Sequence, residues 1–566
     1  MKALNNKNGK MVKRMLILLA VLFVIVFILI KAEDFIKEQT NDKISLVINN
    51  TNVTERLKNE LKIDDGIIYV SMDDMKNFFD KYIYVEDETN EVITTYEDKI
   101  ASIGFESNKL TLNGSTKKTG AHAIKENDTT YLPISEMKDV YDIEINNIAE
   151  TKVITIDSTD REQLKAQTKA DISVKSKKEG FSRTVDKISK GDSVIVVKNN
   201  NEVSEKGWTK IRTQNGKLGY VKTSKLEEIT TIREAKEKTK QINGKVDMFW
   251  DYYSQYVKAP DRTGQVVEGV NVVSPSFFYL EKETGTLKEN VGDAGIAYIN
   301  WAHSNGYKVW AMLSNAEAGI KVSSTILNSY TKRQQLIQSI VEKCAQYDID
   351  GINVDFENMY EADKDKYSRF IIELTPRMEE MGIVTSVDVT APDGDPNWSL
   401  CFDRHVLGDV ADYLIFMGYD QYGTSSSKPG TTAGLNWVET SLKKIIDYDE
   451  VDTDKIILGM PLYTRQWTIT QDGTIKDRST VSMMNIKIPN NVEKQWDDTL
   501  KQYYIEYVSG KNTIKMWIED GASIKEKVAL VTKYNLGGAA CWKKDMETSN
   551  IWSIIKTELA NTSTEK

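Results

Sequence analysis

The sequence has 566 residues, 40% of them hydrophobic, which is enough for about three or four domains with cores of their own. Its 84 acidic and 74 basic residues give a formal net charge of −10, which argues against a nucleic-acid-binding protein. Cys344, Cys401 and Cys541 are odd in number and far apart, and the 3 histidines are equally scattered, so no disulfide framework, metal site or cofactor is predicted.

The N-terminus combines a basic segment with an apolar one. Residues 1–14 carry several lysines and precede an unbroken apolar run at 15–30, which Lys31 closes. Such a run lies between a signal-peptide core and a membrane-spanning helix of about 17 to 25 residues. Because no small-residue cleavage site follows, we interpret 15–31 as a transmembrane signal anchor, with 1–14 in the cytoplasm and the rest on the cell-wall side of a bacterial membrane. A cleaved signal peptide is the alternative, and both interpretations export the remainder.

Residues 44–157 alternate short β-rich runs with turns and contain a weak internal repeat. Residues 67–75 (IIYVSMDDM) match 129–137 (TTYLPISEM), and in both copies a strand precedes a short helix and a later exit strand. This pattern resembles the small α+β module named after the N-terminal domain of copper amine oxidases, which is common in exported proteins of Gram-positive bacteria. The resemblance implies a spacing or wall-associated role, and no copper is expected because no ligand cluster is visible.

Residues 168–228 are predicted to form a small β-barrel, because short strands are separated by regularly spaced turn residues. The segments 207–213 (GWTKIRT) and 219–221 (GYV) are similar to the closing strands of bacterial Src-homology-3-like (SH3-like) domains, which in exported enzymes commonly contact peptidoglycan. Trp208 and Tyr220 are alternatively only core aromatics. The charged residues at 229–243 are predicted to form a helical linker.

Residues 244–560 alternate eight predicted strands with amphipathic helices, an order that implies a parallel sheet with right-handed crossovers. The strands are predicted at 246–250, 269–278, 308–313, 350–357, 384–389, 412–417, 455–460 and 537–542. Eight such units in this length favour an α/β fold of the TIM (β/α)8 barrel type, whose active sites lie at the carboxyl ends of the strands.

The fourth predicted strand, 350–357 (DGINVDFE), places unusual side chains on one face. Strand side chains alternate, so Asn353, Asp355 and Glu357 project together, opposite the apolar residues between them. Unpaired buried charge costs several kcal/mol, so it is tolerated mainly where the charges pair, bind or perform chemistry. With Asp355 ionised, Glu357 is harder to ionise, which makes it a candidate general acid.

This stretch resembles the D-G-x-D-x-D-x-E signature of glycoside hydrolase family 18, the chitinase-like family. The resemblance implies that Glu357 is the general acid, that Asp355 orients the substrate's acetamido group, and that Asp350 and Asn353 belong to the substrate-binding set. Asn353 departs from the family, which most often has an aspartate there. An amide can donate a hydrogen bond to Asp355 but cannot take up a proton, so the usual carboxylate relay is in question.

Residues at other strand ends match the same family. The sequence 417–420 (MGYD) resembles the family's M-x-Y-D, in which the tyrosine binds the acetamido oxygen. An indole offers a flat apolar face for a pyranose ring. By resemblance, the site therefore combines catalytic Tyr419 with the substrate-binding residues Met417, Asp420, Tyr463, Arg465 and Trp542.

The resemblance implies substrate-assisted hydrolysis with retention, in which the sugar's 2-acetamido group is the nucleophile. Chitin and peptidoglycan both contain β-1,4-linked N-acetylglucosamine. The predicted anchor, the SH3-like resemblance and the D-F-E ending, which is closer to the spore-cortex-lytic branch, favour peptidoglycan. A chitinase, a non-catalytic carbohydrate-binding protein and a wall-tethered scaffold remain alternatives, and the sequence identifies no protein partner.

Overall fold

The computed structural model describes residues 15, 16, 18, 19, 21–26, 43–236 and 241–560. The described residues between 15 and 26 are helical, and their large apolar side chains are 47% to 76% exposed. Within the described part of the chain, no helix has both the length and the apolar character needed to cross a membrane. The rest of the predicted anchor, 27–31, and the basic segment 1–14 lie outside the described residues.

The chain divides into two compact units, one built from 1–79 with 120–238 and the other from 80–119 with 239–566. In the first unit, the predicted repeat at 67–75 and 129–137 is confirmed, since each copy is a strand followed directly by a helical turn. The two copies pair antiparallel, with Leu132 opposite Val70. The elements of this part are β1 (Ser45–Ile48), β2 (Thr51–Asn52), β3 (Lys62–Asp64), β4 (Ile67–Ser71), α2 (Met72–Phe78), β10 (Ile124–Glu126), β11 (Thr129–Pro133), α3 (Lys138–Tyr141), β12 (Ile143–Ile148) and β13 (Val153–Ser158).

A seven-stranded antiparallel sheet completes the first unit. Trp208 is buried in it, and a buried ion pair between Arg212 and Asp157 of β13 joins it to the preceding module. The predicted helical linker is wrong at its start, because Thr230–Arg233, rich in β-branched residues, pairs with the sheet as a strand. The strands are β14 (Gln163–Gln167), β15 (Ile172–Lys175), β16 (Thr184–Ile188), β17 (Ser193–Val197), β18 (Trp208–Arg212), β19 (Leu218–Lys222) and β20 (Thr230–Arg233).

The predicted barrel is confirmed in the second unit, where eight parallel strands close on themselves. An inner layer around Trp250, Trp310 and Met312 fills the barrel, and a larger layer packs the strands against the surrounding helices. The barrel strands are β21 (Val246–Asp251), β22 (Val272–Pro275), β25 (Lys308–Ser314), β26 (Gly351–Asp355), β27 (Val384–Val389), β28 (Tyr413–Met417), β29 (Ile456–Pro461) and β35 (Gly538–Trp542).

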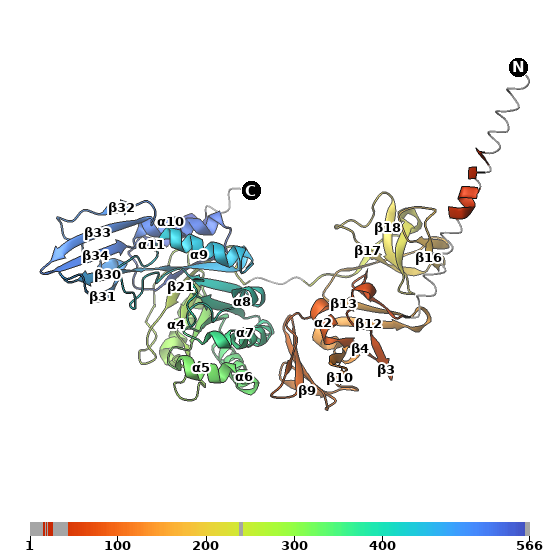
Figure 1. Cartoon of the computed structure of the whole chain (residues 1–566), viewed down its shortest axis with the longest axis horizontal. Coiled ribbons are helices and arrows are strands. Elements are labelled where there is room, and N and C mark those ends of the chain that lie inside the picture. The colour runs from red at the N-terminus through yellow and green to blue at the C-terminus, as the bar shows by residue number, and fades with distance from the viewer. Residues whose placement is uncertain (1–14, 17, 20, 27–42, 237–240, 561–566) are drawn as a thin grey trace, which may run out of the picture. The chain divides into compact units, whose positions relative to one another are not determined.

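The barrel departs from regular alternation at its first crossover. The loop at 252–271 contains no helix, and the second predicted strand, 269–278, is interrupted after Pro275, so that β23 (Phe278–Leu280) pairs with β25 and, in a hairpin, with β24 (Leu287–Glu289). Figure 1 shows the helices around the strands. They are α4 (Gly292–Ser304), α5 (Gly319–Leu327), α6 (Tyr330–Tyr347), α7 (Lys364–Glu379), α8 (Arg404–Val410), α9 (Leu435–Asp447), α10 (Gly521–Lys533) and α11 (Ile551–Ala560).

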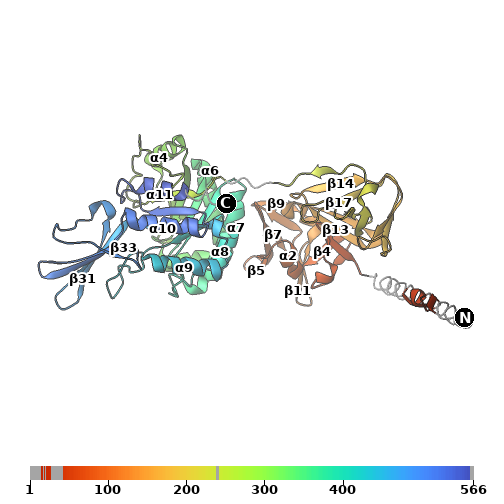
Figure 2. The same ribbon diagram turned by 90° about the horizontal axis from the view of Figure 1, so that it is seen from above.

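A five-stranded antiparallel sheet follows β29 and occupies most of the chain between β29 and α10. In both views it extends away from the helices α9 and α10 (Figures 1 and 2). The chain then enters α10 through Asp520, the helix N-cap, whose side chain accepts from the backbone N–H groups of Ala522 and Ser523. The strands are β30 (Tyr463–Ile469), β31 (Ile475–Ser482), β32 (Gln495–Asp497), β33 (Gln502–Ser509) and β34 (Asn512–Ile518).

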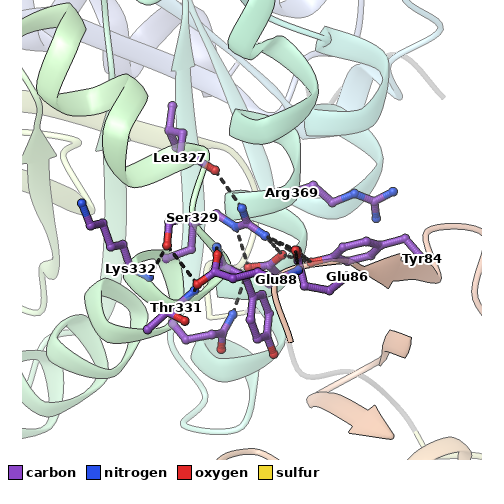
Figure 3. A network of polar contacts seen from close by, with 12 residues as sticks. Tyr84, Glu86, Glu88, Leu327, Ser329, Thr331, Lys332 and Arg369 are labelled. Carbon is purple, nitrogen blue, oxygen red and sulfur yellow. Dashed lines mark hydrogen bonds and ion pairs between the residues drawn. The ribbon is translucent and has the colours of Figure 1, made fainter. Parts of the chain in front are cut away.

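A second five-stranded sheet, formed by residues 80–119 of the N-terminal module, packs against helices α6 and α7 of the barrel. Glu88 accepts hydrogen bonds from the first backbone N–H groups of α6, and the ring of Tyr84 lies 3.9 Å from the guanidinium of Arg369 (Figure 3). This sheet belongs to the catalytic unit although the sequence places it inside another module. Its strands are β5 (Tyr84–Glu86), β6 (Glu91–Tyr96), β7 (Lys99–Gly104), β8 (Lys109–Leu112) and β9 (Ser115–Lys118).

Candidate active site

The alternation of β26 directs polar side chains into the barrel. Ile352, Val354 and Phe356 pack in the outer layer against the helices, so Asn353 and Asp355 face the interior. Both are buried, and Asp355 ends the strand at the carboxyl end of the barrel. Glu357 follows two residues later and is partly exposed.

Asn315, which follows β25, fixes the backbone at Glu357. Its side-chain oxygen accepts from the Glu357 backbone N–H at 2.9 Å, and its amide nitrogen donates to the Glu357 carbonyl at 3.0 Å. Burial raises the pKa of Glu357 well above its usual range, and the charges of Asp355 and Asp420 raise it further. This environment favours the protonated form of the Glu357 carboxyl group, so it can act as a proton donor.

Asp355 is buried and Tyr419 is partly buried, and each has a buried oxygen with unused hydrogen-bonding capacity. Burial and the charge of Asp388 raise the pKa of Asp355 well above its usual range. The Asp355 Oδ1 and the Tyr419 hydroxyl have no hydrogen-bond partner within the protein. In the described part of the chain, no lysine or arginine forms an ion pair with Asp355, Glu357 or Asp388. Buried polar groups are normally paired, so these groups are suited to bind a polar ligand.

Asn353 lies at the centre of a hydrogen-bond network in the barrel. Its Oδ1 accepts from the Trp250 indole at 2.8 Å and from Ser274 at 3.2 Å. Its Nδ2 donates to Asp388 at 2.7 Å and to Ser386 at 3.2 Å. All the polar atoms of the Asn353 side chain are therefore satisfied without Asp355.

Asp420 is held by two residues that the sequence predicts in the same site. Its Oδ1 accepts from the Tyr463 hydroxyl and from the Arg465 guanidinium, both at 2.7 Å. The Tyr463 ring also packs edge-on against Tyr419 at 6.4 Å. Met417 ends β28 and is buried, so it contributes packing rather than a polar group.

Trp542 ends β35 beside other aromatic rings. Its ring lies 5.7 Å from that of Trp250 and 5.4 Å from that of Tyr252. Trp542 is only partly buried and Tyr252 is 42% exposed, so both offer apolar surface at the barrel end. Flat aromatic surface of this kind is suited to a sugar ring.

Asp350 is the predicted substrate-binding residue that the structure does not bring to this site. It precedes β26, at the amino end, where its carboxylate accepts from Lys308 and His303, both at 2.8 Å, and from the backbone N–H of Val309. Five residues of extended strand separate it from Asp355, roughly 16 Å. The motif places it in sequence beside the other carboxylates, but strand direction carries it to the opposite end of the barrel.

Sequence reasoning missed four residues of the site. The alternation of Ser386 and Asp388 with apolar residues in the correctly predicted strand 384–389 is a signal that could have placed Asp388 in the site. Trp250 and Asn315 lie at the ends of correctly predicted strands, but no sequence motif singles them out. Tyr252 follows β21 in a loop, where alternation gives no signal.

The family model of glycosyl hydrolases family 18 matches residues 245–547, more than half of the chain, and that of the copper amine oxidase N-terminal domain matches 42–156. The chain is 24% identical over 296 residues to the uncharacterized glycosylase YvbX of Bacillus subtilis, covering 51% of this chain and 84% of that protein. It is 26% identical over 255 residues to the cortical fragment-lytic enzyme of the same organism, covering 44% and 58% of the two chains. The crystal structure of the spore cortex-lytic enzyme SleL of Bacillus megaterium aligns with a TM-score of 0.48 and 21% identity, covering 58% of this chain and 77% of that one.

A closed parallel barrel with carboxyl groups at the carboxyl ends of its strands places the protein among the barrel enzymes. The extent of the family match makes the class specific: the chain belongs to glycosyl hydrolase family 18 and is a glycosidase of that family. An N-terminal module of the copper amine oxidase type precedes the barrel. The SH3-like assignment of 168–228 stays a prediction.

Proposed function

We propose that the protein hydrolyses β-1,4-linked N-acetylglucosamine glycans, with Glu357 as the general acid that protonates the glycosidic oxygen. The observation that carries this proposal is the cluster of buried Asp355 with partly buried Glu357 and Tyr419, whose carboxyl groups have no basic partner in the described part of the chain. Burial and the neighbouring negative charges favour the protonated form of Glu357, which lies at the barrel end, so it can donate a proton. It would next act as the base that activates water.

In this proposal Asp355 is not the nucleophile that attacks the sugar. The substrate's own 2-acetamido oxygen attacks the anomeric carbon, a recognised exception to the two-carboxylate scheme. The unpartnered Tyr419 hydroxyl is suited to donate to that acetamido oxygen, and Asp355 is suited to accept from the acetamido N–H. Together they would hold the group in the attacking orientation and stabilise the positive charge that develops on it.

Within this class we favour peptidoglycan as the substrate. One relative is named a cortical fragment-lytic enzyme, and others are named chitinases, so relatives support both bacterial-wall and chitin substrates. The exposed apolar side chains between residues 15 and 26 support a membrane anchor that would keep the barrel near the wall. We therefore propose an extracellular, membrane-anchored enzyme.

The test is mass spectrometry of the products formed by the full chain from purified bacterial peptidoglycan and, separately, from chitin oligomers. New N-acetylglucosamine reducing ends from peptidoglycan are expected. Cleavage of chitin oligomers alone would assign the protein to chitin turnover instead.

Asn353, which replaces a family carboxylate, favours a second candidate, a carbohydrate-binding protein without turnover. Intact glycan in both reactions, together with retention of the glycan by the protein in a pull-down, would support that candidate. Intact glycan without retention would contradict both.

A further inference from the structure

Asp388 on β27 is a buried carboxyl group to which no role has been assigned. Its side chain is 1% exposed. Asn353 lies opposite Ser386 and Val354 opposite Val387 in the parallel ladder, so Asp388 is the next residue in register with Asp355. Neighbouring strands are about 4.8 Å apart, and both side chains face the interior, so the two carboxyl groups are neighbours.

The orientation of the Asn353 amide shows whether its oxygen or its nitrogen faces Asp388. An indole N–H is only a donor, so the Asn353 atom that lies 2.8 Å from Trp250 Nε1 must be the acceptor oxygen. The other end of the amide, 2.7 Å from Asp388 Oδ1, is therefore the donating nitrogen. Asn353 holds Asp388 as a hydrogen-bond acceptor, and its own geometry leaves no donor for Asp355.

The groups that act on Asp388 come from every neighbouring element. Burial and the charge of Glu357 raise its pKa, and the hydrogen bond from Asn353 on β26 favours its ionised form. The charge of Asp388 in turn raises the pKa values of Asp355 on β26, of Tyr367 on α7 and of Tyr419 after β28. Since no basic group of the described chain compensates these charges, Asp355 and Asp388 cannot both be ionised at low cost.

We propose that Asp388 is a positioning residue that shares one proton with Asp355 and so replaces the carboxyl group that the family pattern has at position 353. At rest, Asp355 is protonated and Asp388 is ionised. When the acetamido N–H of the substrate reaches Asp355, the proton passes from the Asp355 oxygen to the Asp388 oxygen. One O–H bond breaks and one forms, and no proton leaves the pair.

This transfer leaves Asp355 ionised while it faces the acetamido group. It can then accept from the N–H and stabilise the positively charged intermediate. The inference rests on the proposed function, because the acetamido group is its trigger.

The test compares Asp388→Asn, Asn353→Asp and the double variant that exchanges the two groups. Asp388→Asn leaves Asp355 ionised before the substrate binds, so kcat is expected to stay within about tenfold of wild type and the change to appear in the pH profile. Removing the Asp388 charge lowers the pKa of Asp355, so the acidic limb of the kcat/KM profile moves to lower pH. Asn353→Asp adds a negative charge and moves that limb to higher pH.

The double variant places the carboxyl group at 353, where Trp250 and Ser274 already donate hydrogen bonds. It is expected to return the acidic limb of the kcat/KM profile towards that of wild type, since a carboxyl group again lies beside Asp355 and residues in contact show strong coupling. An Asp388→Asn pH profile equal to that of wild type, or a double variant whose acidic limb stays at that of Asp388→Asn, would overturn the proposal. If Asp388→Asn does not fold, the expected upward shift in Asn353→Asp still decides it.

Infrared spectroscopy of the full chain provides a readout that needs no turnover. The band of protonated carboxyl groups that persists at neutral pH should lose the Asp355 contribution in Asp388→Asn and regain it in the double variant. If the band behaves in this way but the wild type cleaves no glycan, the proposed function fails and the proton pair stands. If the wild type cleaves glycan while band and pH profile are unchanged in Asp388→Asn, the proton pair fails alone.

Discussion

Two groups of buried carboxyl side chains in the second unit differ in what surrounds them. At the interface between the β5–β9 sheet and the barrel, Glu373 is fully buried, but Arg333 donates two hydrogen bonds to it, at 2.9 and 3.0 Å, and Tyr84 donates a third at 2.7 Å. At the barrel end, Asp355 and Glu357 have no basic partner in the described part of the chain.

The difference separates a structural use of buried charge from a chemical one. Burial alone would lower the pKa of Arg333, but its bonds to Glu373 raise it, so the guanidinium stays charged and fixed. At the barrel end, burial and neighbouring negative charges instead raise the pKa values of Asp355 and Glu357, which favours their protonated forms. Buried charge with a cation therefore holds elements together here, and buried charge without one marks the reactive site.

The largest expected effect is the loss of turnover in Glu357→Gln. Glutamine keeps the shape but cannot protonate the leaving group or activate water, so kcat should fall about 10⁴-fold, with glycan binding retained. Turnover is measured by reducing-end release. Glu373→Gln is the control, because it makes the same substitution at a buried carboxyl group of the other cluster and should retain the kcat of the folded enzyme. Comparable losses of kcat in both variants would contradict the distinction between a catalytic and a structural carboxyl cluster.

The next effect is on stability. Arg333→Met leaves Glu373 buried without its cation, which should lower the free energy of unfolding by about 3 to 5 kcal/mol. Denaturant unfolding measures the change. Lys332→Met is the control, since Lys332 is exposed on the same helix and should change stability by less than about 0.5 kcal/mol. Equal effects in the two variants would show that the Arg333–Glu373 pair is not what holds this interface.

Asp247 on β21 gives a third, pH-dependent prediction. Its carboxyl oxygens are buried without partners, and burial raises its pKa to about 8. The folded state therefore holds this proton up to about pH 8, while the unfolded chain releases it near pH 4, so stability falls as pH rises through that window. Asp247→Asn removes this dependence and should be more stable by about 1 to 3 kcal/mol above pH 8. Parallel pH–stability curves for the two proteins would refute the assignment.

The smallest expected effect concerns an exposed ion pair. Lys556 and Glu268 approach to 3.0 Å with side chains 54% and 55% exposed. Lys556→Ala should change the free energy of unfolding by less than about 1 kcal/mol, and raised salt should diminish even that. A larger loss of stability in thermal unfolding that salt does not diminish would contradict this expectation. It would mean that solvent exposure does not determine how much an ion pair stabilises this unit.

Much of the barrel could be predicted from sequence because its strands are short apolar runs with clear periods. The position of Glu357 followed from alternation and from the family motif. The prediction that Asp350 belongs to the substrate-binding set differs from the structure, which places it at the amino end of the barrel. The motif alone does not show at which end of the strand its first residue lies. The strand at 230–233 was missed because a charged neighbourhood suggested a helix.

Contacts between distant segments could not be predicted. Nothing in residues 80–119 indicates that their sheet packs on α6 and α7, because the bonds from Tyr84 and Glu88 join positions more than 200 residues apart. Asn353 illustrates the same limit at the site. The sequence identified the missing carboxylate, but only the strand register brought Asp388 beside it.

Proton NMR of the anomeric region during cleavage of chitin oligomers tests most directly whether the substrate's acetamido group performs the attack. The first product formed should be the β-anomer, and matched oligomers deacetylated at the reacting sugar should remain intact. An initial α-anomer, or cleavage of the deacetylated oligomer at a comparable rate, would contradict substrate-assisted hydrolysis by Glu357 and Asp355.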